Sequence, residues 1–433
     1  MFCHSSPKGI EMAYKIAAID VHKRVLMVVV ASGAEEVKDP TGQALEFECR
    51  RFGTLESDRA RLIAWLQERQ IQEVVMESTA LYWRPIWLDM EGKFGKLHLA
   101  QAQSNRAPKG RKADFKDAKR LARRLLAGEL MLSFVPEAEQ RSWRDAARAK
   151  DHYVAERVQL QNRVEALLEE MRIKLSSVIS DLFGVSGRNI LAALAEGKTT
   201  DPKELAKLGD ERLACGKEKL ADALQGTPRQ LHRKILEIHL EVLNKYDEAI
   251  GKLDKLVAGE LKAHEDAVAR LAEVPGFGVD SAQRFIAEVG VDAEAFPSAE
   301  EFGSWFGGCP GSNISADENH STKSPKGNAY VRKLLTQAAQ AAVRTKGSRF
   351  QALFRKFVTK QKYPGAIWTV AHRLGKVAWK ILHDGVRYIE YGETSTPAAV
   401  KRRIQKQIQA FRKLGYAVTI TPLNPTPEAP CPA

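Results

Sequence analysis

The sequence predicts an N-terminal α/β domain with a mixed sheet, followed by a longer and mostly helical part. Short apolar runs rich in β-branched residues, which are typical of strands, occur within about the first hundred residues. The first runs follow one another directly and the later ones alternate with amphipathic segments, the order of a mixed sheet with helices packed on it. Beyond Pro136, apolar residues recur at steps of three and four, the spacing of one helix face.

The elements of the α/β domain can be placed from these patterns. Apolar or alternating runs predict five strands, at residues 16–21, 25–30, 45–52, 73–76 and 96–100. Three helices are expected between or after them, around 59–68, from about Leu81 and from about Asp114. In the first of these helices the apolar face is formed by Leu62, Trp65 and Leu66.

Two long segments with helical periodicity follow. The first, from Glu137 to Leu175, has no glycine or proline, and its spaced apolar residues are Tyr153, Leu160, Val164, Leu167 and Met171. The second runs from about Gln230 to Leu261 and contains Leu231, Ile235, Ile238 and Val242. Such spacing predicts a helical hairpin or coiled coil, and two ordinary core helices are an equally good interpretation. Shorter helices and loops are expected between them, at 184–226.

These patterns divide the chain into five parts. They are a leader (1–12), the α/β domain (13–136), a helical coiled-coil region (137–265), a helical domain (266–390) and a C-terminal tail (391–433). The helical domain is interrupted between Gly307 and Asn328 by a stretch rich in glycine and asparagine. The tail ends in a proline-rich segment, which is a poor candidate for packing.

Composition limits the class of protein. Lys and Arg number 67 against 54 Asp and Glu, a net charge of +13, which favours a polyanionic partner, either nucleic acid or an anionic membrane surface. No apolar run approaches the roughly 18 residues of a membrane-spanning helix, and the start lacks a signal-peptide layout. Five scattered cysteines indicate neither a disulfide framework nor a zinc site, so a reducing, cytoplasmic location is expected.

Four carboxylates form the most informative pattern. Asp20 and Glu77 each end an apolar strand, and Asp114 and Asp117 are three residues apart, which on a helix would put both on one face. Four carboxylates in one pocket repel one another unless divalent cations bind there. Magnesium suits such ligands, and two ions about 3.5–4 Å apart stabilise the attacking and leaving oxygens of phosphodiester chemistry. Taken singly, each acid has an ordinary explanation as a turn former or helix cap, and His22 is better explained as a loop histidine than as a ligand.

Two further motifs lie in the helical domain. Val274-Pro275-Gly276-Phe277-Gly278 resembles the turn of a helix-hairpin-helix element, in which Gly276 and Gly278 would let the backbone approach a DNA phosphate; a tight turn that binds nothing is the alternative. A loop follows in which small residues surround several serines, and Lys323, Lys326 and Arg332 could neutralise a phosphodiester. A serine hydroxyl needs an activating group, and by composition alone these serines are structural.

The residues carry a family resemblance. The chain resembles DEDD-type insertion-sequence transposases of the IS110 family over roughly residues 13–382. The N-terminal motifs are Ile19-Asp20-Val21-His22-Lys23, Glu77-Ser78, Arg111-Lys112-Ala113-Asp114-Phe115-Lys116-Asp117-Ala118 and Ser133-Phe134-Val135-Pro136. The C-terminal motifs are Val274-Pro275-Gly276-Phe277-Gly278, Phe296-Pro297-Ser298, Cys309-Pro310-Gly311-Ser312-Asn313, Lys326-Gly327-Asn328, Arg332, Ala338-Ala339 and Arg344-Thr345-Lys346.

The resemblance implies a fold and a function. The fold would be an RNase H-like (RuvC-like) N-terminal domain, a coiled-coil middle and a helical transposase domain. Asp20, Glu77, Asp114 and Asp117 would bind Mg²⁺, with Mn²⁺ as the alternative ion, and Ser315 would attack a DNA phosphate. The acids and the serine would come from different protomers of a dimer or tetramer. The partners would be donor and target DNA and a structured guide (bridge) RNA, with no membrane, at the bacterial nucleoid when active.

The chain departs from the family pattern after the serine. Relatives commonly have glycine followed by basic residues, whereas this chain has Asp317-Glu318-Asn319-His320. Ser312, Ser321 and Ser324 are therefore alternative nucleophiles. Two other functions also stay open, namely a RuvC-like nuclease that cuts DNA with water and an inactive relative that only binds nucleic acid.

Overall fold

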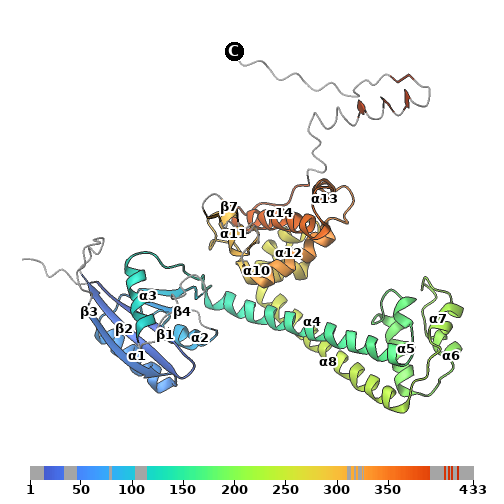
Figure 1. Ribbon diagram of the computed structural model, residues 1–433, viewed down its shortest axis with the longest axis horizontal. Coiled ribbons are helices and arrows are strands. Elements are labelled where there is room, and N and C mark those ends of the chain that lie inside the picture. The colour runs from blue at the N-terminus through green and yellow to red at the C-terminus, as the bar shows by residue number, and fades with distance from the viewer. Residues whose placement is uncertain are drawn as a thin grey trace, which may run out of the picture. The chain divides into compact units, whose positions relative to one another are not determined.

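The computed structural model describes two compact units, Met1–Pro136 and Glu137–Ala433 (Figure 1). The described residues are 14–33, 46–77, 80–102, 115–309, 314–315, 318–319, 324 and 326–390, with short pieces of the tail at 404–405, 408–409, 411–412 and 417–418. The predicted leader and most of the predicted tail lie outside them. Each unit has hydrophobic cores of its own.

The first unit is built on a mixed five-stranded sheet, as the sequence predicts. Its strands are β1 (Tyr14–Val21), β2 (Val25–Gly33), β3 (Glu46–Gly53), β4 (Glu73–Glu77) and β5 (Lys96–Ala100). The order across the sheet is β3-β2-β1-β4-β5. β2 runs antiparallel to both of its neighbours, β1 and β3, whereas β4 is parallel to both β1 and β5.

Helices cover both faces of this sheet. α1 (Glu56–Glu68) and α2 (Trp83–Met90) lie on one face, where Leu62 and Ile86 join strand residues such as Ile19 in one core cluster. α3 (Lys116–Leu126) covers the other face, where Leu121 packs with Ala18. The two faces separate because successive strand side chains point to opposite sides. The predicted apolar face of α1 is confirmed, since Leu62, Trp65 and Leu66 are all buried.

The second unit begins with a long helical hairpin. It consists of α4 (Ala138–Glu170) and α8 (Gln230–Glu260), which run antiparallel, as the ion pairs Arg157–Asp247 and Lys150–Asp254 require. On α4 and its C-cap most of the predicted stripe is buried, namely Leu160, Val164, Leu167 and Met171, whereas Tyr153 is 38% exposed.

The predicted packing stripe of α8 is wrong. Leu231 is 68% exposed and Ile238 is 57% exposed. The buried residues of α8 are instead Leu236, Leu243, Ile250 and Val257. α8 has apolar residues along two of its faces, and periodicity cannot tell which of two such faces meets a partner helix.

The far ends of α4 and α8 hold a small group of short elements, as predicted for 184–226. They are the 3₁₀ helix η1 (Leu175–Ser177) and the α-helices α5 (Val185–Glu196), α6 (Pro202–Lys207) and α7 (Lys217–Ala223). Together they are called here the tip module. Their apolar side chains form one cluster with the adjoining ends of the hairpin.

The remaining helices surround an aromatic core. They are η2 (Leu261–His264), α9 (Glu265–Ala272), α10 (Val279–Val289), α11 (Ala299–Trp305), α12 (Ala329–Ala342), α13 (Arg349–Val358) and α14 (Tyr363–His383). α14 contacts α9, α11, α12 and α13, and Phe285, Phe302, Phe306 and Phe350 are fully buried. The predicted non-helical stretch contains the two-residue strands β6 (Ile314–Ser315) and β7 (Glu318–Asn319). Among the described residues, no helix is both long and apolar enough to cross a membrane.

The turn between α9 and α10 gives a prediction about stability. Gly276 has φ +90°, and a Cβ there would lie 2.1 Å from the carbonyl oxygen of Ala338 in α12. Gly276→Ala is expected to lower the free energy of unfolding by roughly 2–4 kcal/mol, because it adds left-handed strain to a steric clash. Gly278→Ala is the matched control, since a Cβ at Gly278 meets nothing within 4 Å. Urea denaturation of the two variants tests this, and equal stabilities would contradict it.

Candidate active site

Asp20 and Glu77 lie at the same edge of the sheet. β1 and β4 are parallel neighbours in which Ile19 stands opposite Met76, so the next residue of each strand is one of the two acids. Strand alternation puts Asp20 on the side of Ala18, and Glu77 on the side of Val75. Ala18 and Val75 both pack under α3. Both acids therefore belong to the sheet face that α3 covers.

Asp117 reaches the same region from the first turn of α3. Burial raises the pKa of Asp20, and the negative charge of Asp117 raises it further, while the neighbouring His22 and Arg120 act to lower it. The Asp20 side chain is 17% exposed, and its Oδ2 lies 3.1 Å from Nε2 of His22. Arg120 Nη1 lies 3.1 Å from Oδ1 of Asp117. The negative charges of Asp20 and Asp117 therefore repel each other.

The helix expected from about Asp114 begins slightly later in the structure. α3 begins only at Lys116, and Phe115 before it has φ +62°, a left-handed conformation that does not continue a helix. Asp114 itself lies outside the described residues.

The carboxylates of Asp20, Glu77 and Asp117 are chemically suited to binding a hard divalent cation. In the part of the chain that the structure describes, no three His, Cys, Asp or Glu side chains are grouped closely enough to hold a metal ion. The Asp20 side chain is only 17% exposed, and its burial together with the negative charge of Asp117 raises its pKa. A cation between two such groups would relieve both the burial of charge and the repulsion. Carboxylate oxygens are also the ligands that Mg²⁺ prefers.

The glycine turn of the helical domain lies between helices, as predicted. α9 ends at Ala272 and α10 begins at Val279. The close packing of Gly276 on α12 explains that glycine without any nucleic acid. Gly278, by contrast, has open space around it and precedes the first turn of α10, the place where a phosphate could approach the backbone.

Both stems of the serine loop are fixed to the helical core. The backbone N–H of Asn328 donates to the carbonyl of Trp305 at 3.3 Å. Gly327 passes so close to Phe306 that a Cβ would lie 2.1 Å from the Phe306 carbonyl carbon. Arg332 donates from Nη1 to the carbonyl of Gly307 at 2.9 Å, and its guanidinium lies 4.5 Å from the ring centroid of Trp368. Arg332 therefore stands at the base of the loop.

Within the loop only part of the backbone is described. Ser315 of β6 pairs with Glu318 of β7 in antiparallel register. Lys326 is exposed at the second stem, whereas Lys323 and the alternative nucleophiles Ser312 and Ser321 lie outside the described residues. Ser324 is described and is partly buried.

An ion-pair network next to this loop was missed by sequence reasoning. Glu288 of α10 is 3% exposed, and its carboxylate accepts hydrogen bonds from Arg148 Nε at 2.7 Å, Arg148 Nη2 at 2.9 Å and Asn328 Nδ2 at 2.8 Å. Asn328 in turn caps α12 by accepting from the backbone N–H groups of Tyr330 and Val331. The network joins α4, α10 and the second stem of the loop. Its partners are far apart in sequence, so no local pattern could reveal it.

Glu288 is expected to matter strongly for stability. Burial alone would lower the pKa of Arg148, but the hydrogen bonds and charge of Glu288 outweigh it and raise that pKa. Glu288→Gln should lower the free energy of unfolding by about 3 kcal/mol. The change would leave the partly buried guanidinium of Arg148 and the buried guanidinium of Arg144 without the carboxylate that pairs with both. Glu300→Gln is the control, since the carboxylate of Glu300 is 74% exposed in its ion pair with Lys376 and its loss should lower the free energy of unfolding much less. Comparable losses in guanidinium denaturation would contradict the role assigned to Glu288.

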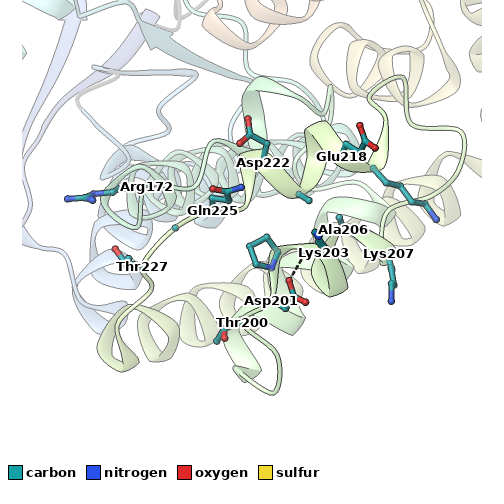
Figure 2. Close-up of a pocket in the computed structure, with 14 residues that line it drawn as sticks. Arg172, Thr200, Asp201, Lys203, Ala206, Lys207, Glu218, Asp222, Gln225 and Thr227 are labelled. Carbon is teal, nitrogen blue, oxygen red and sulfur yellow. Dashed lines mark hydrogen bonds between the residues drawn. The ribbon is translucent and has the colours of Figure 1, made fainter.

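A cavity in the described part of the second unit lies away from these residues. A cavity of about 810 Å³ is formed mainly by α6, α7 and the segments flanking them in the tip module (Figure 2). Basic and acidic side chains line it together, among them Lys203, Lys217, Glu218 and Asp222. None of the predicted site residues contributes to it. Its mixed charges give no preference for a phosphate, so it is not a candidate for the chemistry of the acids or the serine.

Comparison with known proteins gives two family matches and one relative. Residues 17–173 match the family model DEDD_Tnp_IS110, described as a transposase. Residues 268–355 match the model described as "Transposase IS116/IS110/IS902 family". A curated relative, "Insertion element IS900 uncharacterized 42 kDa protein" of Mycobacterium paratuberculosis, is 30% identical over 149 residues. That alignment covers 34% of this chain and 36% of the relative. The first match contains the four acids, and the second contains the glycine turn and the serine loop.

Proposed function

We propose that this chain, which contains two domains of the IS110 transposase type, is a DNA transposase that cleaves and exchanges DNA strands. The observation that carries the proposal is the position of Asp20, a largely buried acid at a strand end whose pKa is raised by burial and by the charge of Asp117 of α3. The five-stranded mixed sheet with helices on both faces supports an RNase H-like, RuvC-like domain. The long antiparallel pair of α4 and α8 supports a coiled-coil middle.

In this proposal the acids hold one or two magnesium ions, with manganese as a substitute. Asp20, Glu77 and Asp117 come from β1, β4 and α3, and Asp114 completes the set. Bound metal would stabilise negative charge on the phosphate oxygens of DNA. The protein's own part is to hold Asp20 in a partly desolvated position, where it binds a cation more strongly than it would bind in water.

Ser315 is the proposed nucleophile. Its Oγ would form a bond to a DNA phosphorus while the bond from that phosphorus to the leaving sugar oxygen breaks, and the leaving oxygen takes a proton. The hydroxyl of another strand would then attack the phosphoserine link and release the serine. The fixed stems of the loop support this role, because a nucleophile must be held in place against its target. The backbone of Ser315 pairs with that of Glu318, so an acidic residue stands opposite the proposed nucleophile. This feature favours the alternative that the protein is an inactive relative that only binds nucleic acid.

The proposed partners follow from charge and family type. The net charge of +13 would serve donor DNA, target DNA and a structured guide RNA. Binding should weaken steeply as salt is raised, because each neutralised phosphate releases counterions. The acids and the serine lie in different units of the chain, and we place their meeting between protomers of a dimer or tetramer.

A denaturing-gel assay tests this function. Labelled DNA carrying the element ends is incubated with the protein in Mg²⁺, and in EDTA as the control. The proposal expects a Mg²⁺-dependent protein–DNA adduct that disappears after protease digestion. Cleaved DNA with no adduct would instead identify a nuclease that uses water, and binding without any cleavage would identify an inactive relative.

A further inference from the structure

The helical domain contains a long segment with no acidic residue. Between Glu318 and Asp384 there is no Asp or Glu, while Lys and Arg number 14. Some of these cations are neutralised by acids elsewhere in the fold, such as Lys333 by Asp151 and Lys376 by Glu300. Others have no ion pair among the described residues. The uncompensated charge therefore collects on particular surfaces of this segment.

One such surface lies where α13 leads into α14, called here the α13 corner and made of Arg355, Lys356, Lys360, Lys362 and Tyr363 (Figure 1). All five side chains are exposed. None of the four cations forms an ion pair among the described residues, and they fall within eight consecutive positions.

Stabilisation of a helix end does not account for this charge. Arg355 and Lys356 lie in the last turn of α13, where cations interact favourably with the helix dipole. Lys360 and Lys362 lie beyond that helix, and Lys362 is directly before α14, at the end of a helix where a cation is unfavourable. Four like charges without counter-charges repel one another, so an anionic partner would stabilise the corner.

The corner also presents an aromatic ring. Tyr363 is 52% exposed, and its ring is held edge-on against Phe354 with centroids 5.5 Å apart. A fixed, exposed ring beside several cations is the arrangement with which proteins bind unpaired nucleotides, since a base stacks on the ring while its phosphates contact the cations. Duplex DNA hides its base faces, and a lipid headgroup has no base to stack.

We infer that the α13 corner binds an unpaired DNA strand. This inference rests on the proposed function, because strand exchange requires a cleaved strand to leave its complement before it is joined to another. The corner would hold that strand through its phosphates and stack one base on Tyr363. It adds a contact site apart from the glycine turn and the serine loop.

Fluorescence anisotropy with full-length protein in EDTA tests the cationic part. The probe is labelled oligothymidine, measured over a range of salt. The double variant Lys356→Ala, Lys360→Ala should reduce the slope of log affinity against log salt by about 1.4, because single strands release about 0.7 counterion per phosphate contact. The matched control is Lys252→Ala, Lys255→Ala, two exposed lysines of α8 with the same total charge. An equal reduction in the control pair would overturn the inference.

The ring is tested with Tyr363→Ala and Tyr363→Phe. The alanine variant should bind oligothymidine about tenfold more weakly, and the phenylalanine variant should match the wild type, because only the ring is needed for stacking. Duplex DNA should bind equally to all three proteins. Equal weakening for duplex DNA, or a loss seen only with oligouridine RNA, would overturn the assignment to a DNA strand. The binding measurements are made in EDTA, where no DNA is cleaved. A negative result there would therefore refute strand binding by the α13 corner without bearing on the proposed function, which is tested by adduct formation in Mg²⁺.

Discussion

Asp20→Asn is expected to slow Mg²⁺-dependent DNA cleavage by about 10³-fold or more. Asparagine keeps the size of the side chain but removes the charge that would hold the cation, and loss of metal assistance at a phosphodiester removes several kcal/mol of stabilisation. Single-turnover cleavage of element-end DNA measures the effect. Glu46→Gln, at the exposed start of the edge strand β3, is the control and should cleave at the wild-type rate.

The same variant has a second readout that needs no activity. The folded protein raises the pKa of Asp20, so the folded state binds its proton more tightly than the unfolded state does. The ionised carboxylate therefore lowers stability at neutral pH, and this loss is relieved as the pH falls through the raised pKa. In EDTA at neutral pH, Asp20→Asn should melt at a higher temperature than the wild type. Addition of Mg²⁺ should raise the melting temperature of the wild type only. A variant that Mg²⁺ stabilises equally would show that Asp20 is not a ligand.

Ser315→Ala is expected to abolish the protein–DNA adduct and to reduce strand exchange by about 10⁴-fold or more. Removal of a covalent nucleophile eliminates the intermediate itself, so the residual rate reflects only binding and metal assistance. Mg²⁺-dependent stabilisation should persist, because the acids lie in the other unit. Adduct formation on denaturing gels measures the result.

Ser324→Ala is the matched control for the serine. Ser324 lies in the same loop, is partly buried, and should be dispensable for the adduct. An adduct retained by Ser315→Ala and lost in Ser324→Ala would move the nucleophile to that position. An adduct retained by both variants would leave Ser312 and Ser321 as the remaining choices.

The strands of the sheet and the positions of Asp20 and Glu77 at their ends could be predicted, because both depend on the sequence of a few consecutive residues. Apolar or alternating runs predicted all five strands, and the parallel pairing of β1 with β4 puts the ends that carry Asp20 and Glu77 at one edge of the sheet. The start of α3 was not predictable in this way, because a single left-handed residue, Phe115, places it at Lys116. Spacing arguments assume a continuous helix and fail where one residue leaves it.

Long-range packing could not be read from the sequence. The two apolar faces of α8 look alike by periodicity, yet Leu236 is buried and Ile238 is exposed. The contacts of Glu288 with Arg148 and Asn328 depend on three elements meeting in space. Gly276 looked like a phosphate-binding glycine, and its contact with Ala338 shows that close helix packing already requires it.

The central claim is that the acids of one protomer act with the serine of another, and a mixing experiment tests it most directly. Asp20→Asn and Ser315→Ala, each inactive alone, are combined in equal amounts under conditions that allow exchange of protomers, with a size tag on the first. For a dimer, about a quarter of the sites should recover, because half of the dimers are mixed and each of these has one complete site. The adduct should be found only on the tagged Asp20→Asn chain, which retains Ser315. No adduct in the mixture, although wild-type protein forms one, would contradict a site shared between protomers.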